Sequence, residues 1–161
     1  MSITFGSFRE EAQLEVLEVY DVQYVIENEE DNEADIISWL EVPGKGIFTI
    51  DLKASEFIID NERHYVLVRV PEPELTECTI IYKDVKRLLF KNDMFNESIG
   101  IGEDMAQKQL KDGYLLIEKS FGLNTQYYNS AVTVAESMII NLIKSLNTEV
   151  ANLEVEVEFI E

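Results

Sequence analysis

The stretch Leu153-Glu154-Val155-Glu156-Val157-Glu158-Phe159 alternates apolar and acidic side chains without a break. Successive side chains of a β-strand point to opposite sides of its sheet. The alternation therefore predicts a strand with its apolar side chains on a core and its glutamates in water. We expect this closing strand over residues 152–160, and it requires earlier strands with which to form a sheet.

The residues before this strand, 103–147, have a helical period instead. Apolar or small residues recur every three or four positions, which is typical of one buried face of a helix. Gly122 divides the segment into two helices, and Asn124 or Thr125 is expected to cap the second. Asn147 is expected to end it in the left-handed conformation. The two predicted stripes are Ala106, Leu110, Tyr114 (or Gly113), Ile117 and Phe121, then Tyr128, Ala131 (or Val132), Ala135, Met138 (or Ile139), Leu142 and Leu146.

Residues 14–90 have the composition of strands. The segment 14–26 carries apolar residues at nearly every even position, which predicts a long strand with that face in the core. These residues are Leu14, Val16, Tyr20, Val22, Tyr24 and Ile26. Further along, the turn-forming sequence Pro43-Gly44-Lys45-Gly46 predicts a hairpin between strands at 36–42 and 47–52.

A second hairpin is expected between residues 57–59 and 64–70, around the polar turn 60–63. Pro71 and Pro73 have no backbone N–H, so they should end the second strand of this hairpin. Strands over 76–82 and 85–90 follow. Strands followed by two helices and a closing strand predict an α+β fold. We expect a mainly antiparallel twisted sheet with both helices on one face, in a single domain over 1–161 with a flexible lead-in over 1–13.

Charge narrows the range of functions. The chain has 161 residues with 13 basic and 32 acidic side chains, so its net charge is −19. Nucleic-acid phosphates and anionic membrane surfaces repel such a chain, and we expect neither partner. One Cys and one His exclude an intrachain disulfide framework, a multi-thiolate metal site and a His-rich metal centre. The sequence has no apolar run long enough to span a membrane. Residues 1–10 do not have the basic flank and apolar core of a signal peptide, so we expect none in the chain as given.

Several short motifs resemble one bacterial family, domain of unknown function 4230, over roughly residues 14–159. They are the opening strand Leu14 to Tyr24, Ile50-Asp51-Leu52, Val70-Pro71-Glu72-Pro73-Glu74-Leu75, Phe121-Gly122-Leu123, Ala131 and Ala135, Leu142 to Leu146, and Val155-Glu156-Val157-Glu158-Phe159. The resemblance implies no reaction, cofactor or catalytic residue. Because members often carry an N-terminal membrane anchor, it implies a place on the outer side of the cell membrane if such an anchor was removed; the chain as given is expected to be soluble.

Two loops raise the question of ligands. Gly100-Ile101-Gly102 precedes the first predicted helix, where phosphates bind in other proteins. The adjacent Glu103 and Asp104 would repel phosphate, so a helix-entry turn is the interpretation we adopt. The acidic loop 27–35 carries the oxygen ligands that Ca²⁺ prefers, but Ile36 stands where an EF-hand needs glycine. We interpret it as a solvated loop, with weak cation binding as the alternative.

Four other features have a structural and a functional interpretation. We expect His64 to be a surface or half-buried side chain rather than a general base, because no nucleophile lies near it in the sequence. Cys78 is expected to be a buried, inert thiol. Trp39 is expected to pack in the core or at an edge, with a binding anchor as the alternative. The strand glutamates Glu154, Glu156 and Glu158 have the spacing of a glycosidase carboxylate pair, but a solvated strand face explains them better. We therefore predict no catalytic, cofactor-binding or metal-ligating residue.

Three functions follow from these observations. The first is a non-enzymatic module that binds a protein partner or assembles with itself. The second is an acidic inhibitor or immunity-type protein that captures a basic partner, which clustering of the carboxylates on one face would support. The third is a carboxylate-dependent hydrolase, which requires a deep pocket with convergent carboxylates.

Overall fold

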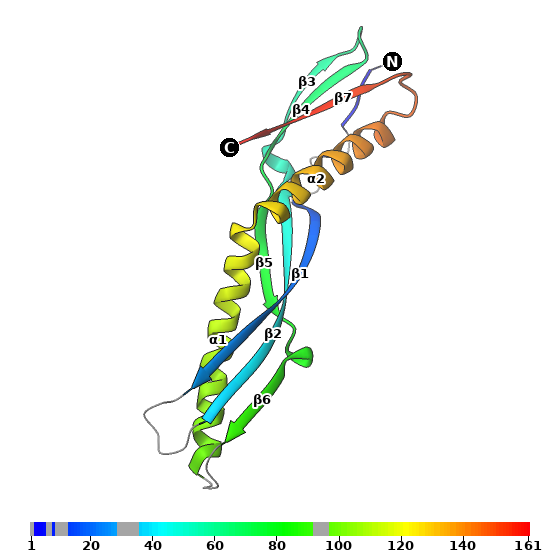
Figure 1. Ribbon diagram of the computed structural model, residues 1–161. Coiled ribbons are helices and arrows are strands. Elements are labelled where there is room, and N and C mark those ends of the chain that lie inside the picture. The colour runs from blue at the N-terminus through cyan, green and yellow to red at the C-terminus, as the bar shows by residue number, and fades with distance from the viewer. Residues whose placement is uncertain (1, 6–7, 9–12, 29–35, 92–96) are drawn as a thin grey trace. The chain divides into compact units, whose positions relative to one another are not determined.

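The computed structural model describes residues 2–5, 8, 13–28, 36–91 and 97–161 (Figure 1). Within them the elements are β1 (Gln13–Asn28), β2 (Ile36–Asp51), β3 (Glu56–Asp60), β4 (Tyr65–Pro71), β5 (Glu74–Ile80), β6 (Lys86–Lys91), α1 (Glu97–Leu123), α2 (Thr125–Leu146) and β7 (Glu154–Ile160). Two short 3-10 turns lie between strands: η1 (Leu52–Ala54) between β2 and β3, and η2 (Tyr82–Asp84) between β5 and β6. The predicted α+β class is confirmed, as are the two helices and the closing strand.

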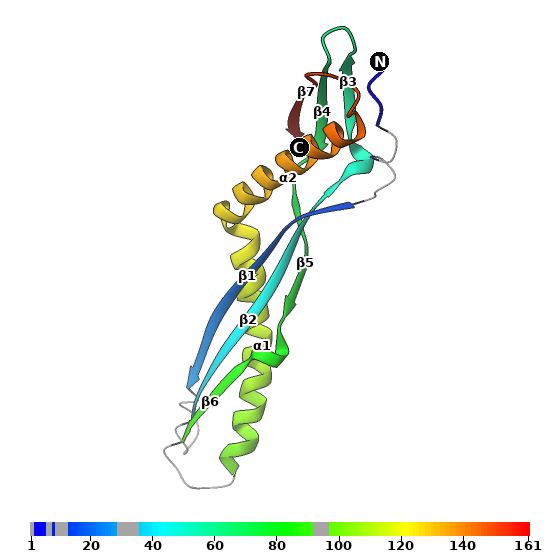
Figure 2. The same cartoon turned by 90° about the vertical axis from the view of Figure 1, so that its right-hand side faces the viewer.

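The strands divide between two sheets. In one, β2 lies between β1 and β5 and also pairs with β6; in the other, the order is β3-β4-β7 (Figure 2). The β2/β6 and β3/β4 pairs are antiparallel, whereas β7 runs parallel to β4. The β3/β4 pair is the hairpin expected around residues 60–63, and Pro71 ends β4 as predicted.

The chain forms two compact units, each made of separate segments. Unit 1 comprises residues 1–18, 47–76 and 125–161, and unit 2 comprises residues 19–46 and 77–124. We expected one domain over 1–161, and that expectation stays a prediction.

Helix α2 covers one face of the β3-β4-β7 sheet in unit 1. On this face Val66, Val68 and Val70 are completely buried. The helix buries a residue at every fourth position, namely Ala131, Ala135, Ile139 and Ile143. The predicted stripe was right for the alanines and for its Ile139 alternative, but Ile143 replaces Leu142, because the buried positions keep a spacing of four. Residues of β7 alternate as predicted, with the glutamates exposed.

Three described residues near the start of the chain, Ile3, Phe5 and Phe8, pack into unit 1. The flexible lead-in expected over 1–13 stays a prediction, because most of that range lies outside the described residues. The side chain of Phe8 is 1% exposed and that of Ile3 is also buried. The ring of Phe5 stacks on Phe57 with centroids 4.0 Å apart, and Phe8 meets the same ring edge-on at 5.2 Å. Burial of these large apolar side chains opposes the entropic cost of ordering the residues that carry them.

Asn147 holds this segment in place. Its Oδ1 accepts a hydrogen bond from the backbone N of Thr4 at 2.7 Å, and its Nδ2 donates to the Thr4 carbonyl at 2.9 Å. Nδ2 also donates to the carbonyl of Ile143 in the last turn of α2. The prediction of a left-handed conformation at Asn147 is wrong: among described non-glycine residues only His64 and Asn152 have positive φ. The Asn147 side chain completes the helix end together with the backbone hydrogen bond from the N of Asn147 to the carbonyl of Lys144.

In unit 2, α1 packs on one face of the sheet. Leu40, Val42 and Ile80 form a buried cluster there, joined by partly buried Val85, Leu110 and Tyr114. Phe121, Ile117, Gly113 and Ala106 are buried on the helix, so the predicted stripe is right with its Gly113 alternative. Gly122 does not interrupt α1, which ends one residue later at Leu123.

The hairpin predicted at residues 43–46 is wrong, because β2 continues straight through Pro43-Gly44-Lys45-Gly46. Pro43 stands opposite the interval between β5 and β6, where its carbonyl accepts from the N of Ile81 at 2.9 Å. Its missing N–H therefore breaks no ladder bond. Gly44 lies so close to Ile117 of α1 that a Cβ would collide with that side chain. The glycine serves close packing rather than a turn.

Candidate functional site

The sheet of unit 2 carries a row of large apolar side chains on the face away from α1. Four come from β1 and one from β2. Their exposed fractions are 58% for Tyr20, 40% for Val22, 55% for Tyr24, 64% for Ile26 and 37% for Trp39. The rings of Tyr24 and Trp39 lie 6.2 Å apart at an interplanar angle of 52°. We call these five residues the aromatic face.

This arrangement reverses the expectation for β1. The even positions from Tyr20 onward were predicted to enter the core, but the odd positions Val19 and Val25 are buried instead. Val16 is buried too, so the inward-facing parity changes between Val16 and Val19. The face toward α1 also accommodates polar groups, because α1 supplies partners for them. The buried Gln109 of α1 donates from Nε2 to the carbonyl of Val25 at 3.0 Å.

Asp21 shows how a charged residue is tolerated on that side. Its carboxylate accepts hydrogen bonds from Ser120 Oγ of α1 at 2.6 Å, from Gln23 Nε2 at 2.8 Å and from the backbone N of Val22. Partial burial raises the pKa of Asp21, but the three hydrogen bonds outweigh it and the net pKa is lowered. Asp21 is thus held ionised against α1, and its neighbours Tyr20 and Val22 point to the opposite side.

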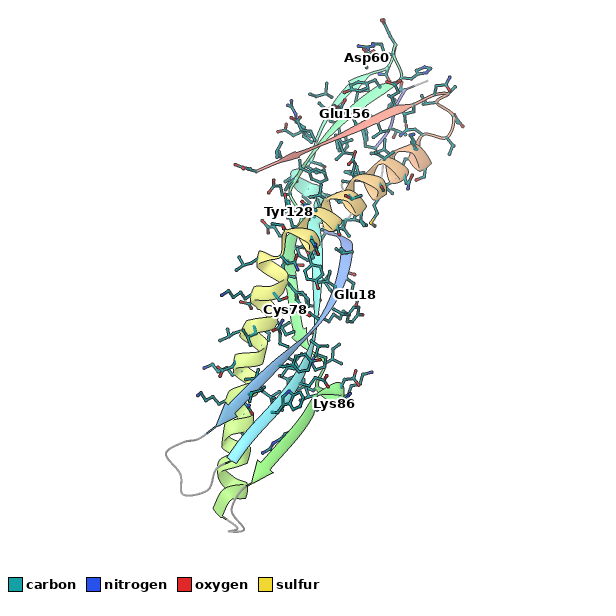
Figure 3. The ribbon with its side chains drawn as sticks, in the orientation of Figure 1. Glu18, Asp60, Cys78, Lys86, Tyr128 and Glu156 are labelled. Carbon is teal, nitrogen blue, oxygen red and sulfur yellow. The ribbon has the colours of Figure 1, made fainter. Side chains whose placement is uncertain are left out.

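A hollow of about 380 Å³ adjoins the aromatic face. Its lining residues are Val22, Glu41, Pro43, Lys83, Asp84, Val85 and Lys86. Lys86, labelled in Figure 3, lies at the start of β6, and its Nζ is 3.5 Å from Oε2 of Glu41. The lining charges are therefore two acidic and two basic, so the hollow is close to neutral in a chain of net charge −19.

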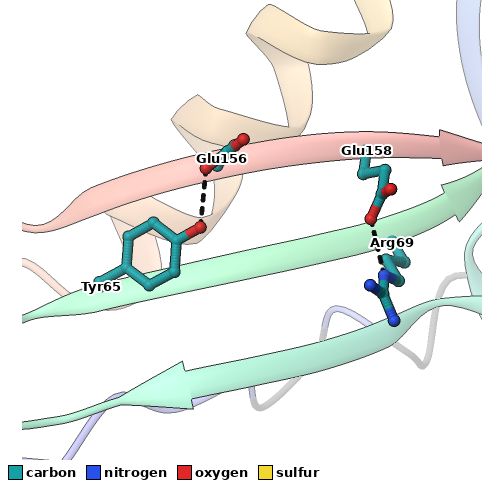
Figure 4. Close-up of polar contacts among 4 residues, drawn as sticks. All are labelled: Tyr65, Arg69, Glu156 and Glu158. Atoms are coloured by element: carbon teal, nitrogen blue, oxygen red, sulfur yellow. Dashed lines mark hydrogen bonds and ion pairs between the residues drawn. The ribbon is translucent and has the colours of Figure 1, made fainter.

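The uncovered face of the β3-β4-β7 sheet in unit 1 has a different character. The pairing register puts Glu56, Asp60, Glu154, Glu156 and Glu158 on one face, around Ile58, Tyr65, Leu67 and Arg69. Tyr65 donates its hydroxyl to Glu156 at 2.7 Å, and Nε of Arg69 donates to Glu158 at 2.7 Å (Figure 4). The bond to Glu156 raises the pKa of Tyr65. We call this surface the acidic face; Figure 3 labels Asp60 and Glu156 on it.

The three strand glutamates are exposed, as a solvated strand face requires. Glu156 and Glu158 face Tyr65 and Arg69 on the neighbouring strand, as Figure 4 shows. These cross-strand contacts fix the register of the parallel pair. The two carboxylates whose spacing resembles a glycosidase pair, Glu156 and Glu158, are therefore engaged in hydrogen bonds within the sheet.

The contacts of His64 and Cys78 are those of residues that support the fold. His64 is half-buried at the end of the β3–β4 turn with φ of 51°, and its Nδ1 lies 2.8 Å from the carbonyl oxygen of Ala151. Its own carbonyl accepts from the N of Glu154 at 2.9 Å. Cys78 is half-buried on β5, where burial and then the charge of Glu118 raise the pKa of its thiol. A raised pKa keeps a thiol protonated and less nucleophilic.

Trp39 and the glycine segment 100–102 lie in other places than the sequence predicted. Trp39 was expected to pack in the core or at an edge, but it lies on the aromatic face in contact with Tyr24. Gly100 and Gly102 lie inside α1 rather than in a turn before it, because the helix begins at Glu97. Most of the acidic loop 27–35 falls outside the described residues, and Glu27 and Asn28 end β1.

Among the described residues, no group of three or more His, Cys, Asp or Glu side chains could hold a metal ion. Neither α1 nor α2, in the described part of the chain, is both long and apolar enough to cross a membrane.

Comparison with known proteins returned no matching family model, no matching curated protein and no matching solved structure. The features that bear on function are therefore the two sheet faces that the described residues leave exposed. Reasoning from the sequence assigned the tyrosines of β1 to the core and so missed the aromatic face. The contact between β1 and α1 determines which side of β1 is buried. It joins residues about 100 positions apart, such as Asp21 and Ser120.

Proposed function

We propose that this chain is a non-enzymatic binding or assembly module that acts through the aromatic face. One observation carries the proposal: five large apolar side chains stand together in water on one sheet face of unit 2. Together they present on the order of 500 Å² of mostly apolar surface. An apolar patch of this size is at the upper end of what single folded domains expose, and such patches are often functional.

The composition of the patch supports the same proposal. Tyr and Trp are enriched where proteins bind one another, because their rings bury a large area at little cost in side-chain entropy. Tyr20, Tyr24 and Trp39 stand on two hydrogen-bonded strands, so their backbone is held in place before any partner arrives. Preorganisation of this kind lowers the entropic cost of binding.

Photo-crosslinking in the native cell tests the proposal. A photoreactive phenylalanine analogue is placed at Tyr24, and the matched control carries it at Leu115, an exposed apolar residue of α1. We expect covalent adducts from position 24 and not from position 115. Absence of adducts from position 24 in cells that express the chain at its natural level would contradict the proposal.

A second candidate function rests on the acidic face. It is an acidic inhibitor or immunity-type protein that binds a basic partner, and the gathering of Glu56, Asp60, Glu154, Glu156 and Glu158 on one sheet face favours it. A field of one sign speeds the encounter with an oppositely charged partner. Its test is calorimetric titration with an oligolysine peptide at 50 and 150 mM salt. Binding should weaken as salt rises, and Glu56→Gln/Glu154→Gln should weaken it more than Glu136→Gln/Glu149→Gln.

The resemblance to domain of unknown function 4230 adds an expectation about location. If the natural gene encodes an anchor upstream, the module is displayed on the outer side of the cell membrane. Fractionation of cells that carry the natural gene tests this expectation. Recovery of the protein with the membrane fraction, sensitive to protease added outside intact spheroplasts, would support it, and recovery with the cytosol would contradict it.

A further inference from the structure

We propose that the partner of the aromatic face is a second copy of this chain, bound face to face about a two-fold axis. This inference rests on the proposed function and specifies its partner.

The acidic face and the aromatic face differ in charge. Two copies of a chain with net charge −19 repel each other, and the repulsion is strongest where carboxylates meet carboxylates. The acidic face, with five carboxylates around Arg69, therefore disfavours self-association. The hollow beside the aromatic face carries Glu41 and Asp84 against Lys83 and Lys86, which balance. Of these two faces, the aromatic one allows close approach of a like-charged copy.

The mixed signs also fit a self-complementary patch. In a two-fold dimer the same surface of each copy faces the other, so each contact between different residues occurs twice. A patch of one sign would repel itself, whereas a patch with both signs can pair the lysines of one copy with the acids of the other. The charges around the hollow satisfy this requirement.

The hollow offers a place for an aromatic side chain. Its volume of about 380 Å³ lies at the lower end of the range for pockets that hold small ligands. Such a hollow accommodates one aromatic ring, and buried aromatic anchors in pockets dominate the affinity of protein interfaces. Tyr20 and Tyr24 flank Val22 on the same strand face, and Val22 lines the hollow. A two-fold arrangement brings a tyrosine of each copy to the hollow of the other.

The area fits a dimer of modest affinity. A standard interface buries about 800 Å² on each partner. The aromatic face supplies roughly 500 Å² of this, and the rim of the hollow supplies polar surface around it. We therefore expect a dimer that dissociates on dilution into the micromolar range rather than a permanent one.

Sedimentation of the purified chain from 1 to 300 µM tests the inference. We expect the wild type to pass from monomer to dimer. Dimerisation should persist or strengthen between 50 and 500 mM salt, because salt screens the repulsion between like-charged copies. Tyr20→Ser/Tyr24→Ser should weaken it at least tenfold. The matched control Leu115→Ser/Leu116→Ser changes two exposed apolar residues of α1 and should leave it unchanged.

Trp39 gives a second measurement that does not depend on a variant. It is the only tryptophan in the chain and lies on the aromatic face, 37% exposed. Dilution of the wild type should shift its emission to longer wavelength over the same concentration range as the mass change. Circular dichroism of each variant controls for folding.

The outcomes separate the inference from the proposed function. A wild type that stays monomeric at 300 µM in both salts, with constant Trp39 emission, overturns self-association. If position 24 then crosslinks to a different protein in cells, the proposed function stands and only the partner is wrong. A dimer that survives Tyr20→Ser/Tyr24→Ser but not Leu115→Ser/Leu116→Ser also overturns the inference, because it places the interface on α1.

Discussion

Gly113 of α1 lies directly against Val42 of β2, so that a Cβ added to the glycine would be 2.8 Å from Cγ2 of Val42. Real Cβ atoms do not approach so closely, and the neighbour is a rigid β-branched side chain in the buried cluster of unit 2. The absence of a side chain at Gly113 therefore sets how closely the helix approaches the sheet.

Gly113→Ala is expected to destabilise the protein. Overpacking a core costs about 1–3 kcal/mol, and the better helix propensity of alanine, about 1 kcal/mol, offsets only part of it. Gly122→Ala is the matched control in the same helix, since no atom lies within 4 Å of the added Cβ. We expect Gly122→Ala to stabilise slightly. Urea denaturation compares the two, and equal effects would show that α1 does not rest on β2 at Gly113.

Gln109→Leu should destabilise unit 2 by about 1–3 kcal/mol. The side chain of Gln109 is completely buried, and its Nε2 donates to the carbonyl of Val25. Leucine fills a similar volume but leaves that carbonyl without this donor. Gln107→Leu, at an exposed position of the same helix, is the control and should change the free energy of unfolding little. Hydrogen exchange should show faster opening of β1 in Gln109→Leu alone.

Asn147→Asp should release the start of the chain. A carboxylate cannot donate to the carbonyls of Thr4 and Ile143, which would then face a negative charge. The expected loss of stability is about 2–4 kcal/mol. Asn141→Asp adds the same charge at an exposed position of α2 and serves as the control. Limited proteolysis should cleave the first residues faster in Asn147→Asp than in wild type; equal rates would contradict the role given to Asn147.

Alkaline pH should weaken the fold. Burial and then the hydrogen bond to Glu72 raise the pKa of Tyr128 above the ordinary tyrosine value of 10.0, and contacts with glutamates raise the pKa values of Tyr65 and Tyr114. A raised folded pKa contributes stability that is complete below pH 10 and is lost as pH rises through the folded value. Urea unfolding between pH 8 and about pH 11.5 measures this loss.

Tyr128→Phe should make that pH dependence shallower, since it removes one of the groups that release a proton more readily on unfolding. Tyr82→Phe changes a tyrosine that is 70% exposed and is the control. A Tyr128→Phe profile that runs parallel to the wild-type profile above pH 10 would argue against the contact between Tyr128 and Glu72.

The elements of the fold were largely predictable, because their periods are strong. The alternation of 153–159 and the stripe through Ala131 and Ala135 depend only on local geometry, and both are present. Which face of β1 is buried was not predictable. Apolar residues occupy both sides of that strand, and the charge of Asp21 made the inner side resemble a solvated one. Only the structure shows that Ser120 of α1 donates a hydrogen bond to Asp21 there.

The turn expected at Pro43 failed for a related reason. Proline and glycine together are typical of turns, yet each has a use inside a strand that only distant contacts reveal. Pro43 stands where the neighbouring edge is interrupted, and Gly44 makes room for Ile117. The aromatic face could not be predicted for the same reason, since its exposure depends on which side of the sheet α1 packs against.

The parallel pairing of β7 with β4 has a consequence for synthesis on the ribosome. Tyr65 pairs with Glu154 and Pro71 pairs with Ile160. The β4/β7 pair therefore cannot form until residues almost ninety positions after β4 have been synthesised. All segments of unit 2 have been made by Asn124, whereas unit 1 still lacks its last strand. We expect unit 2 to acquire structure while the chain is nascent and the open edge of β4 to be the point at which chaperones or misfolding compete with completion.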